Sequence, residues 1–296
     1  MTVLEARLAL VRVSFADLQD LTKPRITLLI LLTALLGFVL AGGALGLSAV
    51  GLLVGTALVS SGSSGLNQVL ERESDARMRR TENRPLPSGR LRPADAILLS
   101  ILLSAGGLLL LALTVNLLTA GLAALTLVSY AFLYTPLKKV SSLATVVGAI
   151  PGALPPLGGW AAATGALSPP AFILFAIVFL WQMPHFMAIA CLYRDDYRRG
   201  GMPMLPVVDE EGRFTALQVL LYNAALLPVS LLPTALGMAG GLYLAGASLL
   251  GIGLNAAGLH FARCRTQTNA RSLLLASVVY LPLLCGLLFL DRTGVS

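Results

Sequence analysis

Two groups of oxygen-bearing side chains stand where long apolar stretches of this chain end. The first is Asn67, Glu71 and Asp75, spaced four residues apart, and the second is the pair Asp195 and Asp196. If a helix continues beyond Asn67, the first three side chains share one face, about 6 Å apart. Mg²⁺ prefers one or two carboxylates, several waters and substrate phosphates. The spacing therefore predicts a magnesium site at Asn67, Glu71 and Asp75, with Asp195 and Asp196 as further metal ligands.

Basic side chains accompany both acidic groups. Arg80 and Arg84 follow the first group, Lys138 ends a Thr-Pro-Leu string, and Arg25 opens the first apolar stretch. Such cations can hold the phosphate oxygens that a metal leaves free, so we expect these four to clamp a diphosphate. The competing interpretation is a solvated helix end with local ion pairs, and for Lys138 a charge that only sets topology.

A histidine stands inside an apolar stretch, several residues before the loop that carries Asp195. His185 ends the string Trp-Gln-Met-Pro-His, in which Pro184 is expected to kink or locally open a helix. Ionisable residues at membrane depth are rare and usually functional. The alternative is a core histidine with a satisfied hydrogen bond. The run of Gly and Pro over 148–159 is likewise expected to form a broken segment that is buried or lines a cavity.

The composition is that of a membrane protein. Hydrophobic residues make up 56% of the 296 and charged residues 12%, whereas soluble domains carry about 25% charged residues. The apolar runs are continuous and near 20 residues long, which indicates helices rather than the alternating strands of a β-barrel. We predict an all-α fold, in which residues 1–296 form a single bundle of nine transmembrane helices, near 26–45, 49–67, 94–115, 117–136, 142–163, 170–192, 215–235, 238–260 and 272–290.

The basic residues define a topology. Twenty of the 21 Lys and Arg residues fall on one side of this nine-helix arrangement, and only Arg292 falls on the other. The positive-inside rule makes the rich side cytoplasmic, with the N-terminus inside and the C-terminus outside. Residues 1–25 then form a cytoplasmic amphipathic lead-in rather than a cleavable signal peptide. The two longest loops, 68–93 and 193–214, share the cytoplasmic face and are the expected catalytic loops.

Charge and cysteine content exclude other classes. The net charge of +7 follows from topology, so no nucleic-acid partner is expected. The three cysteines, Cys191, Cys264 and Cys285, lack the paired spacing of a disulfide framework or a zinc site.

The motifs resemble the UbiA superfamily of intramembrane aromatic prenyltransferases over nearly the whole chain. The resemblance rests on nine spans, on two acidic motifs four spans apart, and on these strings: Lys23-Pro24-Arg25; Asn67 with Asp75-Ala-Arg-Met78-Arg-Arg80-Thr81-Glu-Asn-Arg84; Tyr134-Thr-Pro-Leu-Lys138; Trp181-Gln-Met-Pro-His185-Phe186; and Asp196-Tyr197 followed by Pro203-Met-Leu-Pro206-Val-Val208. The last three strings are the most specific. Many relatives carry Asp where Glu71 stands, and most superfamily members carry Asp where His185 stands.

The finer pattern resembles the members of the superfamily that act on heme. This resemblance implies Mg²⁺-dependent transfer of a farnesyl group from farnesyl diphosphate to a vinyl group of heme b, with addition of water, giving heme O. It favours Asp196 over Asp195 as a metal ligand, and it makes His185 a heme contact, as iron ligand or as propionate partner. The expected location is a bacterial cytoplasmic membrane. The candidate partners are heme A synthase and the terminal-oxidase assembly. No residue pattern in the sequence predicts them.

Two other functions compete with this one. A related enzyme could prenylate an aromatic quinone precursor by the same chemistry, but His185 and the string Pro203–Val208 argue against it. A secondary transporter would also contain broken helices and charges. Transporter sites usually lie near the bilayer midplane, whereas the acidic residues here gather at one face.

Overall fold

The computed structural model describes residues 14–293, and within them the chain is almost entirely helical. The first thirteen residues of the predicted lead-in lie outside this range. The helices are α2 (Phe15–Thr22), α3 (Pro24–Leu40), α4 (Leu47–Asp75), α5 (Pro93–Thr114), α6 (Leu117–Val128), the π-helix η1 (Ser129–Tyr134), α7 (Thr135–Leu137), α8 (Ala144–Thr164), α9 (Pro169–Leu192), α10 (Arg194–Arg199), α11 (Leu205–Val208), α12 (Arg213–Ala235), α13 (Gly241–Arg263) and α14 (Gln267–Leu290).

The helices confirm the predicted polytopic all-α fold. By length and composition, eight segments within residues 14–293 can cross a membrane, with α6, η1 and α7 counted together. The short helices α2 and α3 meet at a 47° bend and supply a ninth span if they are counted as one. The bend lies at Lys23, the one residue other than glycine with a positive φ (50°) among those described. Proline at the first position of α3 favours helix initiation directly after this bend.

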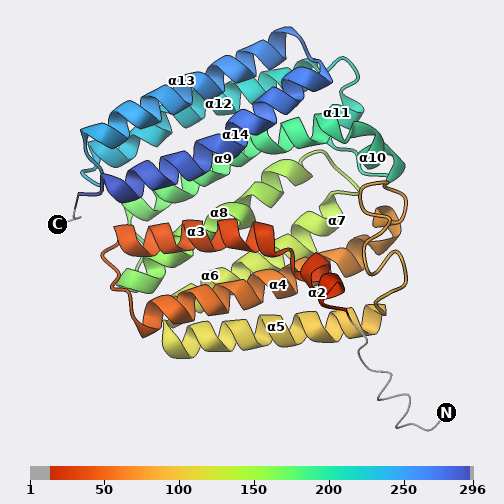
Figure 1. Cartoon of the computed structure of the whole chain (residues 1–296), viewed down its shortest axis with the longest axis horizontal. Coiled ribbons are helices and arrows are strands. Elements are labelled where there is room, and N and C mark those ends of the chain that lie inside the picture. Colours follow the sequence, from red (N-terminus) through yellow and green to blue (C-terminus); the bar gives the residue numbers. More distant parts are fainter. Residues whose placement is uncertain (1–13, 294–296) are drawn as a thin grey trace.

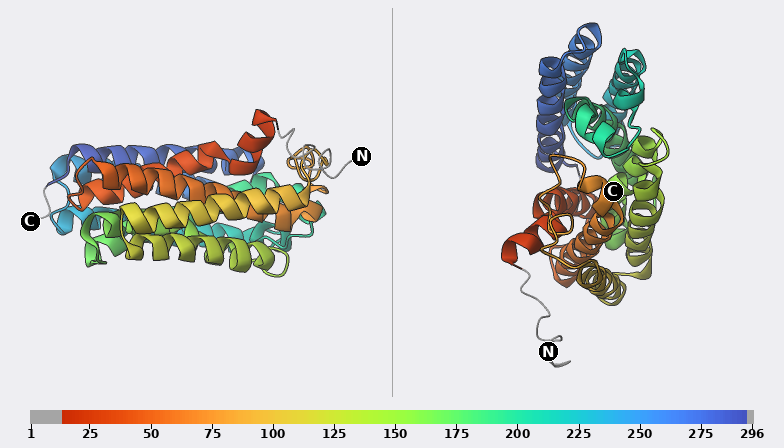
Figure 2. Two further views of the ribbon diagram at one scale, coloured as in Figure 1. Left: turned by 90° about the horizontal axis from the view of Figure 1, so that it is seen from below. Right: turned by 90° about the vertical axis from the view of Figure 1, so that its right-hand side faces the viewer.

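The long helices lie side by side, and the longer connections gather at one end of the bundle (Figure 1). That end carries α2, the turns of residues 76–92 between α4 and α5, and the short helices α10 and α11; the C-terminus lies at the opposite end. The left view of Figure 2 shows the same separation, and the right view looks along the bundle from this end. The two loops expected to carry chemistry therefore share one end, which we call the loop end.

The predicted break in the Gly- and Pro-rich segment was wrong. Helix α8 runs without interruption from Ala144 to Thr164 and contains Pro151, Pro155 and Pro156. Each proline removes only one helical hydrogen bond, and neighbouring helices can satisfy the backbone groups that are freed. Gln182 of α9 also donates to the carbonyl of Ala149 at 3.1 Å and ties α9 to this segment. Helix α9 is also continuous through Pro184, so of the two predicted effects the local opening was wrong and the kink stays a prediction.

Glycines in α8 and α3 allow these two helices to touch along their backbones. A Cβ placed on Gly159 would lie 1.8 Å from the Ala34 carbonyl oxygen, and one on Gly37 would lie 2.1 Å from that of Pro156. These glycines therefore permit close approach of the two helices. The contact holds α3, and with it the Lys23 bend, against the interior of the bundle.

Candidate active site

A buried row of polar side chains occupies the last two turns of α4. Asn67, Glu71 and Asp75 are only 1%, 3% and 0% exposed. The apolar part of the helix ends near Asn67, but α4 continues to Asp75. The three side chains therefore share one helix face, as their four-residue spacing requires. Burial of three such groups is costly unless each has a partner.

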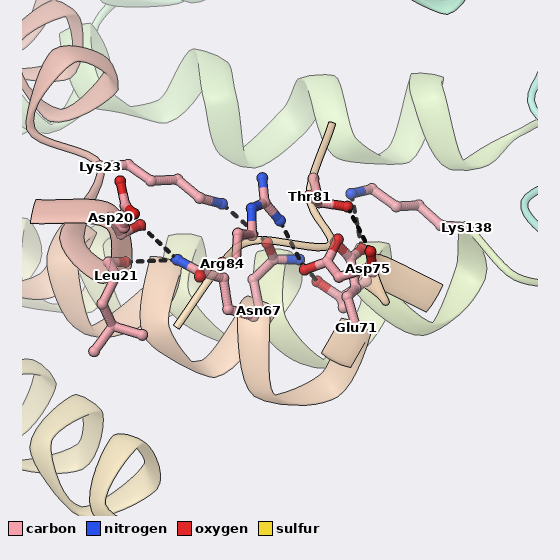
Figure 3. A network of polar contacts seen from close by, with 11 residues as sticks. Asp20, Leu21, Lys23, Asn67, Glu71, Asp75, Thr81, Arg84 and Lys138 are labelled. Atoms are coloured by element: carbon pink, nitrogen blue, oxygen red, sulfur yellow. Dashed lines mark hydrogen bonds and ion pairs between the residues drawn. The ribbon is translucent and has the colours of Figure 1, made fainter. Parts of the chain in front are cut away.

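Two of the three face cations from distant parts of the chain (Figure 3). Lys138 Nζ lies 2.8 Å from Glu71 Oε1, and Arg84 Nη1 lies 2.7 Å from Asp75 Oδ2. The Lys138 side chain is itself only 13% exposed and lies over the Tyr134 ring at 4.6 Å. Burial would lower the pKa of Lys138, but the attraction of Glu71 prevails and raises that pKa well above 10.5. This lysine is therefore a permanent cation in the site.

The third member, Asn67, has its carboxamide orientation fixed by two partners. Its Nδ2 donates to Thr135 Oγ1 at 3.0 Å, and its Oδ1 accepts from Lys23 Nζ at 3.2 Å. The Thr135 hydroxyl proton is already committed to the carbonyl of Tyr130 at 2.8 Å, so Thr135 can only accept from Asn67. The same carbonyl accepts from the Thr135 backbone N–H, a bond across five residues that belongs to the π-helix η1, and π-helical turns are frequent at functional sites.

The second acidic group divides between two places. Asp196 accepts hydrogen bonds from the backbone N–H of Arg79 at 3.0 Å and from the Arg199 guanidinium. Burial raises the pKa of Asp196, but these hydrogen bonds outweigh it and hold the pKa below its usual value. Asp195 instead pairs with Arg198 at 3.4 Å, with 75% of its side chain exposed.

Asp195 also lines a separate cavity of about 310 Å³, beside Arg194 and Asp209. The structure thus brings Asp196 onto the loop that follows Asp75, but it does not bring Asp195 there. Asp195 instead matches the competing interpretation: it lies at a solvated helix end and forms a local ion pair.

The remaining predicted cations differ in their environments. The Arg80 guanidinium lies over the rings of Tyr193 and Tyr197, at 4.8 and 5.7 Å, and has no ion pair within residues 14–293. Arg25 is exposed. Lys23 occupies the place in the site that was predicted for Arg25. The string Lys23-Pro24-Arg25 identified the right turn. The left-handed conformation of Lys23, which a sequence does not reveal, determines which cation faces inward.

The oxygen donors of this row are of the type that a hard divalent cation binds. No three Asp, Glu, His or Cys side chains converge anywhere in residues 14–293, so a metal here would use two carboxylates and the Asn67 carboxamide. Asp75 Oδ1 is buried without a hydrogen-bond partner in the described chain. An unsatisfied buried carboxylate oxygen is costly. A hard cation would satisfy this oxygen. Mg²⁺ prefers a site with few carboxylates, in which other positions stay open for phosphate oxygens.

His185 lies apart from this cluster, on the face of α9 that meets α14. Its ring stacks on Trp181 with centroids 4.9 Å apart, and its Nδ1 is 2.9 Å from Ser277 Oγ. The Trp181 indole N–H donates to the Ser277 carbonyl oxygen at 2.7 Å. His185 thus has the satisfied hydrogen bond of a core histidine, but only through one of its two nitrogens.

A bundle of membrane helices with buried acids and cations at one end defines a class of intramembrane enzymes that handle charged leaving groups. Residues 30–281 match the UbiA prenyltransferase family. The chain is 50% identical over 290 residues to the protoheme IX farnesyltransferase of Solibacter usitatus (strain Ellin6076), covering 94% of this chain and 99% of that protein. The protein belongs to the UbiA prenyltransferase family.

Solved structures share the fold. The structure titled "Structural and mechanistic insights into the biosynthesis of Digeranylgeranylglyceryl phosphate synthase in membranes" superimposes with a TM-score of 0.78 at 16% identity, over 93% of this chain and 97% of that one. A UbiA homolog from Archaeoglobus fulgidus bound to DMAPP and Mg²⁺ superimposes with a TM-score of 0.67 at 18% identity, over 93% and 98% of the two chains. The protein is accordingly an integral membrane prenyltransferase.

Proposed function

We propose that the protein transfers the farnesyl group of farnesyl diphosphate to a vinyl group of heme b, with addition of water, to give heme O and diphosphate. The observation that carries the proposal is the buried row of Asn67, Glu71 and Asp75 matched with three cations, in a chain half identical to a protoheme IX farnesyltransferase over nearly the full length of both.

Asn67, Glu71 and Asp75 would hold Mg²⁺ and, through it, the diphosphate, and Asp196 would hold a second cation on the neighbouring loop. When bound, the metal supplies positive charge that stabilises the departing diphosphate. The unsatisfied Oδ1 of Asp75 supports this assignment. Asp195 faces another cavity, and we assign it no ligand role. Asp196 is connected to the loop that follows Asp75 by the hydrogen bond that it accepts from the Arg79 backbone N–H.

The basic residues clamp the diphosphate. Lys138, Arg84 and Lys23 each hold a member of the α4 row in the absence of substrate. Their long side chains can turn to phosphate oxygens once the acids bind metal. Arg80 is stacked on two tyrosines rather than paired with an acid, so it can meet phosphate without breaking an ion pair. Preorganised cations of this kind stabilise charge that develops in the transition state.

The transfer itself needs an apolar space. As the bond from the farnesyl carbon to the diphosphate oxygen breaks, the allylic carbon becomes cation-like. The vinyl π electrons form the new carbon–carbon bond. Water adds to the cation left on the porphyrin side chain, and one proton is released. The buried walls of α4 and α9 restrict water at the first of these stages.

The same site would serve an aromatic quinone precursor as acceptor, and this remains the second candidate. The structural neighbours share only the fold, so they do not favour it. His185, whose Nε2 forms no hydrogen bond within residues 14–293, favours heme. A transporter is a poorer description, because the buried acids lie in the last turns of α4, next to the loop end.

Location and topology follow from the same reasoning. We propose a bacterial cytoplasmic membrane, with the loop end and the N-terminus in the cytoplasm and the C-terminus outside, because the basic residues concentrate at the loop end. Residues 1–296 would act as one catalytic domain. The product would supply heme A synthase or terminal-oxidase assembly.

The proposal is tested by offering purified protein farnesyl diphosphate, Mg²⁺ and either heme b or 4-hydroxybenzoate, with products identified by mass. We expect a farnesyl-plus-water adduct on heme and no prenylated phenol. Prenylation of the phenol alone would keep the fold and the diphosphate site but replace the acceptor.

A further inference from the structure

We infer that Ser277 fixes His185 in the tautomer whose Nε2 is unprotonated, and that Nε2 is a ligand to the iron of the heme substrate rather than a partner of a heme propionate. The inference rests on the proposed function, because it concerns how the acceptor is held. It assigns Ser277, which neither the motifs nor the proposed reaction includes, as a positioning residue.

The tautomer follows from one shared proton. Ser277 Oγ lies 2.7 Å from the carbonyl oxygen of Leu274 and 2.9 Å from His185 Nδ1. The hydroxyl has a single proton, and a carbonyl oxygen can only accept. The proton therefore goes to Leu274, and the Ser277 oxygen must accept from Nδ1–H. A neutral imidazole with hydrogen on Nδ1 carries its lone pair on Nε2.

The ring is also held in place. It stacks on Trp181 with an interplanar angle of 25°, and Trp181 is tied to the backbone of the same Ser277 by its indole N–H. Ser277 and Trp181 are 0% and 5% exposed. Both the plane and the rotation of the imidazole are therefore fixed by α9 and α14 together. Metal-binding histidines are usually oriented in this way, through a hydrogen bond of the other ring nitrogen.

Nε2 is the free end of this arrangement. It forms no hydrogen bond within residues 14–293, and it is not among the sealed side-chain atoms that lack a partner. An unprotonated nitrogen cannot donate to a carboxylate, and its lone pair would repel one. A heme propionate is thus the wrong partner for this tautomer, whereas an iron with an open axial position is suited to it.

His185 lies between the loop end and a narrow apolar groove deeper in the bundle. His185 is seven residues before the end of α9, which places it about 10 Å from the loop end along the helix. It lies two turns beyond Val178, and Ser277 lies one turn before Leu281. Val178 and Leu281 line an apolar groove between α9, α14, α3 and α8, together with Leu36. The imidazole therefore lies where α9 and α14 meet, between this groove and the diphosphate site.

The test compares ferrous heme b with metal-free protoporphyrin IX, which has the same propionates but no iron. Affinities are measured by absorbance for the wild type, His185→Ala and Ser277→Ala, in detergent and without farnesyl diphosphate. We expect His185→Ala to weaken heme binding at least about tenfold and Ser277→Ala about tenfold, while both variants bind the metal-free porphyrin like the wild type. The iron–histidine vibration of the ferrous complex should be present in the wild type and absent in His185→Ala.

Two variants serve as controls. His260→Ala removes the other histidine of the chain. Ser272→Ala removes an exposed hydroxyl from the same helix, bonded only to the Thr268 carbonyl. Both should bind heme like the wild type. Equal losses for both porphyrins in His185→Ala would overturn the iron-ligand role, and so would an effect that disappears with the dimethyl ester of heme. Wild-type protein that binds no heme would overturn the proposed function itself.

Discussion

Thr135 accepts a hydrogen bond from the side-chain amide of Asn67 at 3.0 Å, and so turns the Asn67 oxygen toward Lys23 and the acids of α4. The threonine oxygen can only accept here, because its hydroxyl proton goes to the Tyr130 carbonyl, which also accepts from the Thr135 backbone N–H at the end of the π-helix. One irregular turn thus decides which end of a carboxamide faces the diphosphate site.

Replacing Thr135 by valine should weaken the response to Mg²⁺. Valine keeps the shape of this buried side chain but cannot accept from Asn67 Nδ2, so the carboxamide loses its fixed orientation. We expect the Mg²⁺ concentration for half-maximal activity to rise roughly tenfold, the lower end of the range for residues that orient a metal ligand. Thr135→Ser should stay near the wild type. An unchanged Mg²⁺ titration for the valine variant would contradict the role of Thr135.

Asp75→Asn should abolish most turnover while the protein still folds. The substitution is isosteric but removes the charge that faces Arg84 and the oxygen that lacks a partner. A loss of about 10²–10³ in kcat is expected, comparable with the loss of one preorganised electrostatic group. Asp95→Asn is the matched control, because Asp95 pairs with Arg92 on the outer side of α5. Retention of most activity by Asp75→Asn would remove its metal-ligand role.

Metal removal should stop the reaction reversibly. EDTA is expected to reduce farnesyl transfer to background, and excess Mg²⁺ to restore it, because two carboxylates and a carboxamide hold the metal only weakly without substrate phosphates. Product formation over time is the measurement. A rate that EDTA leaves unaffected would make the buried acids of α4 structural.

The ion pair between Lys138 and Glu71 should contribute stability that does not vary with pH near neutrality. Its lysine has a pKa raised well above 10.5 by Glu71, against the effect of burial. Stability from a raised pKa is complete below the unfolded value and is lost only as pH rises through the folded one. Lys138→Gln should therefore cost about 3 kcal/mol with a constant shift in Tm from pH 6 to pH 9. Lys139→Gln, at an exposed neighbour bonded to the Leu70 carbonyl, should cost little. A Tm difference that vanishes toward pH 9 would contradict the assignment.

Gly159→Ala should destabilise the bundle, since the added methyl group meets the Ala34 backbone at 1.8 Å. Overpacking of this kind costs about 1–3 kcal/mol. Gly158→Ala, one residue away with no atom within 4 Å of the added carbon, should be neutral or slightly stabilising because alanine favours helix. Thermal unfolding in detergent compares the two variants. Equal Tm values would show that α3 and α8 can separate without cost.

The sequence predicted the helices well because apolar length and charge placement are local properties. Apolar length predicts the spans, and charge placement predicts the common end of the two long loops. The four-residue spacing predicts the row of Asn67, Glu71 and Asp75. Predictions from proline were poorer. A proline frees a backbone group, and whether a helix then breaks depends on the helices packed against it, which for α8 are α3 and α9 from other parts of the sequence.

The inward cation and the orienting residues were beyond the reach of sequence reasoning. Lys23 and Arg25 are equivalent by type, and only the bend at Lys23 separates them. Thr135 and Ser277 are ordinary residues in apolar stretches, and their roles arise from contacts 68 and 92 residues away. Asp195 and Asp196 differ only in the direction that α10 gives them.

The most direct test of heme farnesylation is the product formed in water enriched in ¹⁸O. Purified protein with Mg²⁺, farnesyl diphosphate and heme b should yield a heme that carries one farnesyl group and one ¹⁸O-labelled hydroxyl, whereas Asp75→Asn should yield almost none. A farnesylated heme without the label would contradict the addition of water. No heme product, with a prenylated quinone precursor in its place, would contradict the proposed function.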